Sequence, residues 1–262
     1  MEKKAVIYSD VDGTLIFHND FHRIQEKGRN PDETVSVYDP KTRRHYTALD
    51  VSTRLYGSYM DQGTQALGLA LQEHCTMVAV TGGRRTTLEA RKHALTFLDA
   101  AILESGGVIL YGRDEDGKYM EDKEWKGMLE PERKELRKFQ KFLIGTEWAL
   151  DYEGRTSSIR IRREDNLERA DEFEELPGYV KNALPPELEV TKNMGHLDII
   201  LASAGKGNAA TYLTDRLGYS QRQSVGIGDD DNDLDLLYGT GVKLVLGSSS
   251  PLVIKVAKSQ YW

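Results

Sequence analysis

The stretch AVIYSDVDGTL at residues 5–15 decides the fold of this 262-residue chain. Its first half is a short apolar run that ends in small and acidic residues, which is typical of a strand buried on both faces of a parallel sheet. Three later runs have the same form, at residues 77–80, 224–227 and 242–246. Helical patterns lie between the runs, at residues 64–73, 86–98 and 208–217. This alternation predicts an open, Rossmann-like α/β sheet with its ligand site at the carboxyl ends of the strands.

The composition is that of a globular protein with an acidic balance. Lys and Arg number 35 and Asp and Glu 42, so the net charge is −7. This charge favours neither nucleic acid nor an anionic membrane as a partner, and a phosphorylated ligand must be held by a few local cations. The one cysteine, Cys75, excludes an internal disulfide and a thiolate metal site. With no long apolar run and no signal-peptide pattern, the sequence predicts a cytoplasmic protein without a membrane partner.

Two segments interrupt the alternation of strands and helices. Residues 30–60 predict a hairpin that turns at Asp39-Pro40, either a lid over the site or an extension of the sheet edge. Residues 113–196 are highly charged and predict an inserted α+β cap domain. We therefore expect a catalytic core formed by residues 1–112 and 197–262, with the parallel sheet resuming near Leu197. The sequence leaves the oligomeric state open.

The densest chemical signal is the pair Asp10 and Asp12 directly after the first strand. Gly13 lets the chain turn, so both carboxylates can reach the same space. Two adjacent carboxylates repel each other and a phosphate, so the arrangement requires a cation. Asp10 can then act as a covalent nucleophile and Asp12 as a general acid and base. A turn-capping loop explains the same pattern without chemistry.

A second acidic segment, GDDDND at residues 228–233, also follows an apolar run and starts a helical pattern. Four aspartates in five residues favour a hard divalent cation bound through oxygen atoms. Asp229 is best placed to bind the metal, and Asp233 can orient its surroundings. A helix N-terminus also favours acidic residues, but that explains only one or two of the four.

Two weaker signals involve phosphate-binding residue types. Lys206 lies between two glycines at the start of a helix, where its ammonium group and nearby N–H groups can hold a phosphate. Thr81, Gly82 and Gly83 end the second strand ahead of Arg84, which gives a hydroxyl and free N–H groups for an oxyanion. Taken singly, a surface lysine and a simple helix cap account for these residues.

Numbered along the chain, the four motifs lie at residues 10–15, 81–84, 205–207 and 228–233. In order and in position, they resemble those of the haloacid dehalogenase-like phosphatase superfamily. The chain is similar to its Cof and sucrose-phosphate-phosphatase-like subgroup with a B-type C2 cap, and ESGG at residues 104–107 resembles the segment that precedes such caps. The resemblance implies that Asp10 forms an aspartyl-phosphate and that Asp12 protonates the leaving alcohol and activates water. It implies Mg²⁺ between the Asp10 carboxylate, the Asp12 main-chain carbonyl and Asp229, with Asn232 and Asp233 completing the metal and phosphate shell. Thr81 and Lys206 would hold the phosphoryl oxygens.

Other residues are candidates for contacts with the substrate. The extra glycine in TGGR leaves open whether Arg84 or Arg85 faces the site. Arg160 and Arg162 alternate with isoleucines on a predicted strand, which suits either an anionic leaving group or a solvated sheet face. His196 is a candidate either for a contact with a sugar hydroxyl or for a structural role at the hinge of the cap. The substrate-binding candidates are Thr14, Gly82, Gly83, Arg84, Asn232, Arg160 and His196.

His18 and His22 follow the first motif and suggest either a second metal site or, as the better interpretation, surface histidines.

Together the motifs predict a Mg²⁺-dependent phosphatase that acts on a small phosphorylated metabolite, namely a sugar phosphate. The alternatives are a phosphosugar mutase similar to phosphomannomutase and a non-catalytic protein that binds phosphate esters.

Overall fold

The structure is a computed structural model that describes residues 3–18, 24–30, 34–53, 57–193 and 195–260. Its largest sheet has seven strands in the order β10-β9-β8-β7-β1-β15-β16. In the middle of this sheet, β1 (Ala5–Asp10) pairs in parallel with β7 (Cys75–Val80) and β15 (Ser224–Gly228). On the far side of β15, β16 (Val242–Val245) is also parallel. The four predicted strands and the Rossmann-like core are therefore confirmed.

The other half of the central sheet contains strands that the sequence patterns did not predict. They are β8 (Ala100–Leu103), parallel to β7, then β9 (Val108–Arg113) and β10 (Tyr119–Glu121), which are antiparallel. The charged residues 114–118, expected to start the cap, form the tip of the β9–β10 hairpin, where Gly117 has a φ of +74°. The expected start of the cap at residue 113 is therefore wrong, because the chain turns back into the sheet.

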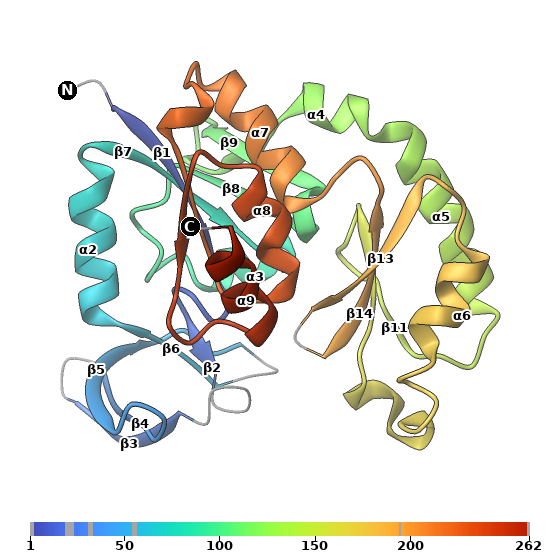
Figure 1. The fold of residues 1–262 in the computed structure, drawn as a ribbon, viewed down its shortest axis with the longest axis horizontal. Coiled ribbons are helices and arrows are strands. Elements are labelled where there is room, and N and C mark those ends of the chain that lie inside the picture. The colour runs from blue at the N-terminus through green and yellow to red at the C-terminus, as the bar shows by residue number, and fades with distance from the viewer. Residues whose placement is uncertain (1–2, 19–23, 31–33, 54–56, 194, 261–262) are drawn as a thin grey trace.

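Helices cover both faces of the central sheet (Figure 1). In β1, Val6 and Tyr8 pack into one apolar cluster and Ile7 into the other, so the strand is buried from both sides. The first cluster contains Ala209, Ala210 and Leu213 of one helix, and the second is closed by residues such as Leu88 and Phe97. The helices of this part are α2 (Gln62–Gln72), α3 (Arg85–Ala90), α7 (Lys206–Arg216), α8 (Leu234–Tyr238) and α9 (Pro251–Ser259). Of these, α3 ends eight residues before the expected end at Leu98.

A second sheet, which we call the cap-side sheet, lies beside the core, on the right of Figure 1. It is antiparallel, in the order β11 (Leu150–Asp151), β12 (Ser158–Ile161), β14 (His196–Leu201) and β13 (Leu188–Asn193). The expectation that the parallel sheet resumes near Leu197 is wrong, because β14 pairs with β12 and β13. Every residue of β14 is buried, so its apolar run looks like a parallel strand. The helices on this side are α4 (Lys123–Met128), α5 (Glu130–Ile144) and α6 (Leu176–Ala183).

A third sheet, which we call the inserted sheet, has the order β2-β6-β5-β4-β3. Its strands are β2 (Phe17–His18), β3 (Gln25–Arg29), β4 (Val35–Asp39), β5 (Arg44–Asp50) and β6 (Ser58–Asp61). The predicted hairpin at Asp39-Pro40 is present as β4 and β5. The edge-extension alternative is wrong, since the inserted sheet forms a separate sheet that Figure 1 places beyond the carboxyl end of β1.

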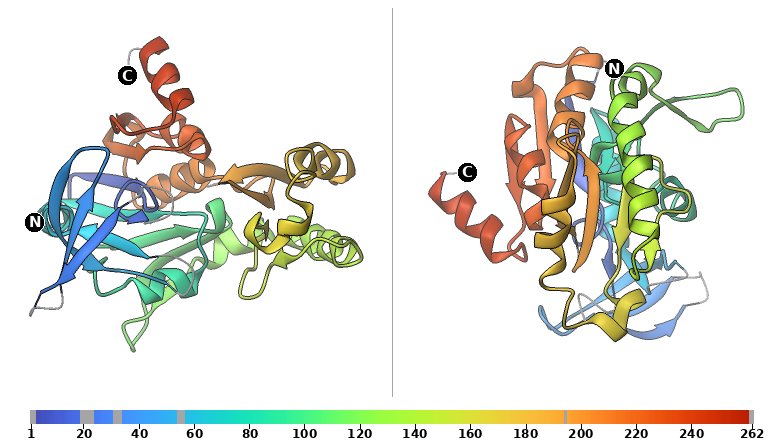
Figure 2. Two further views of the ribbon diagram at one scale, coloured as in Figure 1. Left: turned by 90° about the horizontal axis from the view of Figure 1, so that it is seen from below. Right: turned by 90° about the vertical axis from the view of Figure 1, so that its right-hand side faces the viewer.

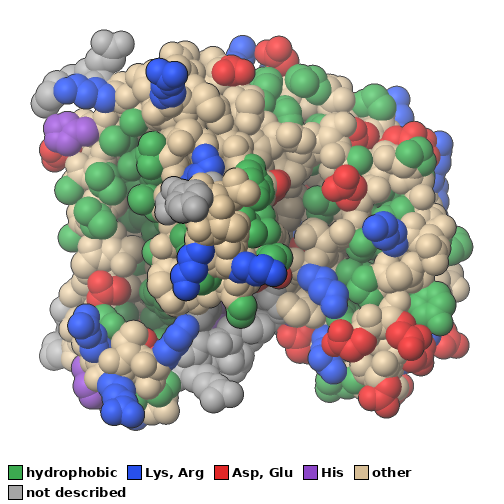
Figure 3. Space-filling model, in the orientation of Figure 1, with side chains coloured by type: hydrophobic (Ala, Val, Ile, Leu, Met, Phe, Trp, Pro, Cys, Tyr) green, Lys and Arg blue, Asp and Glu red, His purple; other side chains and the backbone are tan. Residues whose placement is uncertain are grey.

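Short 3₁₀ segments complete the fold: η1 (Glu104–Gly106), η2 (Glu164–Arg169), η3 (Gln221–Gln223) and η4 (Asp231–Asp233). Figure 2 shows α9 projecting from the rest of the molecule. On the face in Figure 3, acidic side chains gather at the lower right, at the end that holds η2 and α6. None of the helices in the described part of the chain combines the length and apolar character that a bilayer crossing needs.

Candidate active site

Three neighbouring strands of the central sheet end at one point. Asp10 is the last residue of β1, Thr81 follows β7 and Asp229 follows β15. Because these parallel strands are adjacent in the order β7-β1-β15, their carboxyl ends bring the three loops together. The turn after β1 is made by Gly13, whose φ is +100°, a conformation that glycine adopts at little cost.

A cluster of acidic residues forms where β1 and β15 end. Oxygen atoms of Asp10, Asp229 and Asp233 all lie within 4.8 Å of one another, the one such group among the described residues that is able to hold a metal ion. Lys206, at the start of α7, places its Nζ atom 2.8 Å from Asp10 Oδ1 and also donates to Asp233 Oδ1. Asn232 Oδ1 lies 3.5 Å from the same Nζ atom. The structure thus brings the first, third and fourth motifs together.

The pKa values in this cluster show a shortage of positive charge. Burial, with the charge of Asp233, raises the pKa of Asp10 well above its usual value despite the nearby Lys206. Burial raises the pKa of Asp229 to about 6, with further contributions from Asp233 and Asp230. Burial would lower the pKa of Lys206, but Asp10 and Asp233 raise it, so the ammonium group stays charged. Three carboxylates around one lysine fit a divalent cation, for which oxygen ligands are preferred.

Asp233 and Asp229 differ in the groups that they contact. Asp233 Oδ2 accepts the backbone N–H groups of Asp229 and Asp230, at 3.0 and 3.1 Å, and so holds their loop. Asp229 Oδ1 accepts a hydrogen bond of 2.7 Å from Thr14 Oγ1. A Cβ atom on Gly13 would lie 2.4 Å from Asp229 Oδ2, so glycine is what lets the two loops approach.

Asp12 has a different environment from Asp10. Its Oδ1 atom lies 2.7 Å from Arg91 Nη1 and 2.9 Å from His18 Nε2, and its Oδ2 atom lies 3.3 Å from Thr81 Oγ1. Burial alone would raise the pKa of Asp12, but Arg91 and His18 outweigh it and lower the pKa. In the protein without ligand, Asp12 is therefore a fixed, charged carboxylate beside the acidic cluster.

Sequence reasoning missed Arg91 and misjudged His18. The expectation that His18 lies on the surface is wrong, because it is 1% exposed. The available signal was the alternation after the first motif, since Ile16 and His18 face inward on either side of Phe17. For Arg91 the sequence holds no comparable signal. His22 lies outside the described residues.

The second motif contacts the cap-side sheet. Arg155 Nη1 donates to the Gly82 carbonyl oxygen at 3.0 Å, and a Cβ atom on Gly82 would lie 2.3 Å from Asn193 Nδ2. Arg84 donates to the carboxylate of Asp151 and to the Glu153 carbonyl oxygen.

The choice between the two arginines of the second motif follows from these contacts. Arg85 turns the other way, toward the Tyr119 carbonyl oxygen, 2.7 Å away, and Glu89. Arg84, not Arg85, thus faces the site.

The arginines of β12 are paired rather than solvated. Arg160 forms two hydrogen bonds, of 2.6 and 2.7 Å, with Asp198, and Arg162 Nε lies 2.9 Å from Asp165. His196 is buried, and burial with the charge of Arg160 lowers its pKa. These groups line a pocket of about 80 Å³ next to Asp12. Its lining includes Asp12, His18, Gly83, Arg84, Arg91, Arg155, Arg160, Arg162, Asn193 and His196.

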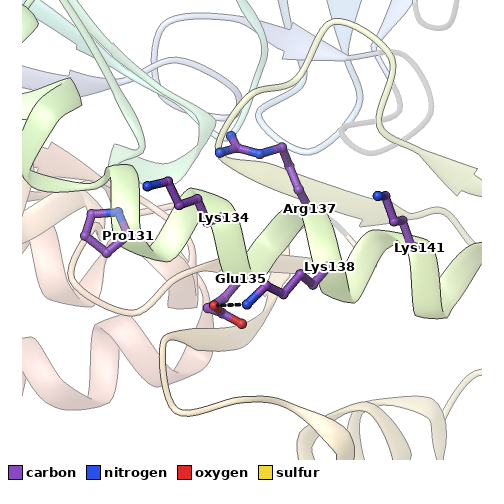
Figure 4. A pocket seen from close by; sticks show the side chains of 6 residues that line it. All are labelled: Pro131, Lys134, Glu135, Arg137, Lys138 and Lys141. Atoms are coloured by element: carbon purple, nitrogen blue, oxygen red, sulfur yellow. Dashed lines mark hydrogen bonds and ion pairs between the residues drawn. The ribbon is translucent and has the colours of Figure 1, made fainter.

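Two other pockets are lined by side chains of other kinds. A cavity of about 1030 Å³ separates the inserted sheet from Gly13 and Asp229, and Phe17, Tyr46 and Tyr59 are among its lining residues. Figure 4 shows a hollow on α5 lined by Pro131, Lys134, Glu135, Arg137, Lys138 and Lys141. All six residues come from one helix and none belongs to the acidic cluster, so this hollow is not the candidate site.

Comparison with known proteins agrees with the geometry. The family model of haloacid dehalogenase-like hydrolases matches residues 86–261, and the chain belongs to this family. A phosphoglycolate phosphatase of Archaeoglobus fulgidus is 24% identical over 173 residues, 66% of this chain and 70% of that protein. A phosphoglycolate phosphatase of Staphylothermus marinus is 22% identical over 154 residues, 58% of this chain and 61% of that protein.

Solved structures share the fold. The sucrose-phosphatase of Synechocystis, in complex with sucrose and phosphate, has a TM-score of 0.62 and 15% identity, covering 98% of this chain and 88% of that one. A phosphatase of the same superfamily from Bacteroides thetaiotaomicron has a TM-score of 0.59 and 15% identity, covering 97% and 88%. The family, with its phosphatase members, confirms the prediction of a haloacid dehalogenase-type phosphoric monoester hydrolase.

Proposed function

We propose that the protein is a Mg²⁺-dependent phosphatase that hydrolyses a small phosphorylated metabolite through an aspartyl-phosphate on Asp10. The observation that carries the proposal is the buried cluster of Asp10, Asp229 and Asp233, with Lys206 2.8 Å from Asp10. Asp10, Asp229 and the Asp12 main-chain carbonyl would hold the metal, with Asp233 orienting them. Bound there, Mg²⁺ would supply the positive charge that a phosphate ester needs beside so many carboxylates.

The reaction would proceed in two steps. A carboxylate oxygen of Asp10 attacks phosphorus, the bond from phosphorus to the leaving oxygen breaks, and that oxygen receives a proton from Asp12, which has first taken it from water. Water then attacks phosphorus, Asp12 takes its proton, and the bond to Asp10 breaks with release of inorganic phosphate. Lys206 and Thr81 would hold the phosphoryl oxygens, and Lys206 also offsets the charge of Asp10.

A sugar phosphate is the first substrate class that we propose. It is supported by the likeness in fold to a sucrose-phosphatase and by Arg155, which reaches Gly82 from the loop between β11 and β12. A compact leaving group that carries a carboxylate is the second candidate. Five arginines line the pocket beside Asp12, and two relatives are phosphoglycolate phosphatases. At about 80 Å³ the pocket is smaller than a cavity of roughly 150 Å³ that admits benzene.

We place the protein in the cytoplasm, with the small phosphorylated metabolite as its partner. The support is chemical, since Cys75 is the one cysteine of the sequence and is free. Free thiols persist in a reducing compartment. The net charge of −7 supports a small ligand rather than nucleic acid.

Phosphate release from a panel of esters tests the proposal. The panel contains hexose phosphates, a disaccharide phosphate and phosphoglycolate, each with Mg²⁺ and with a chelator. We expect turnover with Mg²⁺ only, and its loss in Asp10→Asn. Turnover that survives the chelator or the substitution would refute the proposal. With a hexose 1-phosphate, a mutase would form hexose 6-phosphate, and calorimetric binding without turnover would favour a non-catalytic protein.

A further inference from the structure

His18 connects the inserted sheet to the catalytic loop. It lies in β2, and its Nε2 atom is 2.9 Å from Asp12 Oδ1. Its Nδ1 atom is 2.7 Å from the Oγ atom of Ser58, which lies opposite it in β6. Both side chains are buried. The inserted sheet therefore supplies a Ser58–His18 pair that reaches the carboxylate assigned above to proton transfer.

Ser58 and Asp12 together define the state of the His18 ring. A charged carboxylate only accepts hydrogen bonds, so the Nε2 atom of His18 carries the hydrogen that points to Asp12 Oδ1. In a neutral imidazole the other nitrogen accepts, so Nδ1 then accepts from the Ser58 hydroxyl. Ser58 thus holds the orientation of the ring from the far side.

The contacts of Asp12 leave little freedom to its carboxylate. Arg91 and His18 hold Oδ1, and Thr81 contacts Oδ2. Arg91 and Thr81 come from the core, whereas His18 is a contact through which the inserted sheet reaches this carboxylate. Proton transfer demands a group within hydrogen-bond reach of the reacting atom, and small displacements are costly.

We propose that His18, oriented by Ser58, is a positioning residue for Asp12, so that the inserted sheet is a working part of the active site. The proposal rests on the proposed function, in which Asp12 gives a proton to the leaving group. It concerns the placement of the carboxylate and assigns no chemical step to His18 itself. The two sheets that flank the site would then have different roles: the inserted sheet aligns the acid, and the cap-side sheet contacts the second motif.

The leaving group provides a sharp test. p-Nitrophenolate departs without needing a proton, whereas an alkoxide needs one. For His18→Ala we expect kcat on an alkyl phosphate to fall roughly 10- to 100-fold, a part of the roughly 10²- to 10⁴-fold that general acid–base catalysis contributes, at nearly unchanged KM. The pre-steady-state burst of p-nitrophenolate, which reports attack by Asp10, should keep its rate and amplitude. His18→Gln, which keeps a donor near the Nε2 position, should recover part of the alkyl turnover.

Ser58→Ala tests the same idea with a smaller change, should His18→Ala fail to fold. It should lower alkyl turnover and spare the burst. His45→Ala is the matched control, because His45 is exposed on β5 of the same sheet. A loss of burst rate as large as the loss of alkyl turnover would show a merely structural role, and unchanged alkyl turnover would show no role; either overturns the proposal. If the wild-type protein hydrolyses neither ester, the proposed function fails first, and this inference falls with it.

Discussion

Asp10 and Asp12 lie two residues apart, yet their surroundings shift their pKa values in opposite directions. Burial and the charge of Asp233 raise the pKa of Asp10, while Arg91 and His18 lower that of Asp12 against the effect of burial. Paired acids with separated pKa values are typical of sites in which each has its own task. At Asp10, the raised pKa marks a carboxylate that needs added positive charge before it is a good nucleophile.

Asp229 predicts how metal binding depends on pH. Its pKa rises from 3.8 to about 6 on folding of the metal-free protein, mainly through burial. Between these values the unfolded chain releases the proton while the folded chain keeps it. This group therefore favours the folded state at low pH, and that contribution is lost as pH rises toward about 6. A metal ion requires the charged carboxylate, so its binding has the opposite dependence.

We expect Mg²⁺ to raise the melting temperature more at about pH 7.5 than at about pH 5, because affinity falls by up to about tenfold per pH unit below the pKa. Thermal unfolding with and without Mg²⁺ at both pH values measures this. Asp229→Asn should abolish the rise at either pH. An equal rise at both pH values in the wild type would contradict the assignment of Asp229 as a ligand.

Among the elements, the loops after β1 and β15 are fitted to each other. Gly13 has a φ of +100°, and the Asp229 carboxylate occupies the space that a side chain on Gly13 would need. Thr14 then donates to the same carboxylate at 2.7 Å. Two loops more than two hundred residues apart in sequence thus depend on one missing Cβ atom.

Gly13→Ala should therefore damage the metal site more than the fold. The strain of a left-handed alanine is about 1–2 kcal/mol, and the added atom displaces Asp229. We expect Mg²⁺ affinity, followed by calorimetry, to fall at least roughly tenfold, the equivalent of about 1.4 kcal/mol. Gly28→Ala is the control, because its Cβ atom would meet nothing within 4 Å and Gly28 does not have a positive φ. Mg²⁺ binding of wild-type strength in Gly13→Ala would show that the two loops are not coupled.

For the whole molecule, polar contacts join the core to the cap side close to the site. Glu104, at the turn after β8, accepts N–H groups of Thr156 and Ser157, and Arg155 donates to Gly82. From the core, Arg84 reaches Asp151 of β11. The residues that place the cap-side sheet are therefore neighbours of those that would hold phosphate.

Arg84→Ala should loosen the cap-side sheet and raise KM roughly three- to tenfold, in line with the net contribution of about 0.5–1.5 kcal/mol of a typical hydrogen bond. Arg85→Ala is the matched control, since Arg85 contacts Tyr119 and Glu89 away from the site and should leave KM unchanged. Steady-state kinetics on whichever ester is turned over compares the two. A larger effect at Arg85 would contradict the placement of Arg84.

Local sequence patterns predicted most of the core fold and the acidic residues proposed to hold the metal. The apolar runs before Asp10, Thr81 and Asp229 are short and end in turn residues. The strands, and the reactive residues that follow them, could therefore be predicted from the sequence. The sequence pattern gave the wrong sheet for β14. This strand is buried because it lies between β12 and β13 in an antiparallel sheet, not because it belongs to the parallel sheet between two layers of helices. Burial on both sides produces the same apolar run in either setting.

The sequence by itself determined which residues carry charge and hydroxyl groups at the ends of the core strands, because a strand and its following turn are specified by neighbours in the chain. Only the tertiary structure decided what surrounds Asp12. His18, Ser58 and Arg91 come from an inserted sheet and from the end of α3, and their contacts depend on how separate layers pack. Such contacts leave no periodic trace in the sequence, since a single side chain from each element makes them.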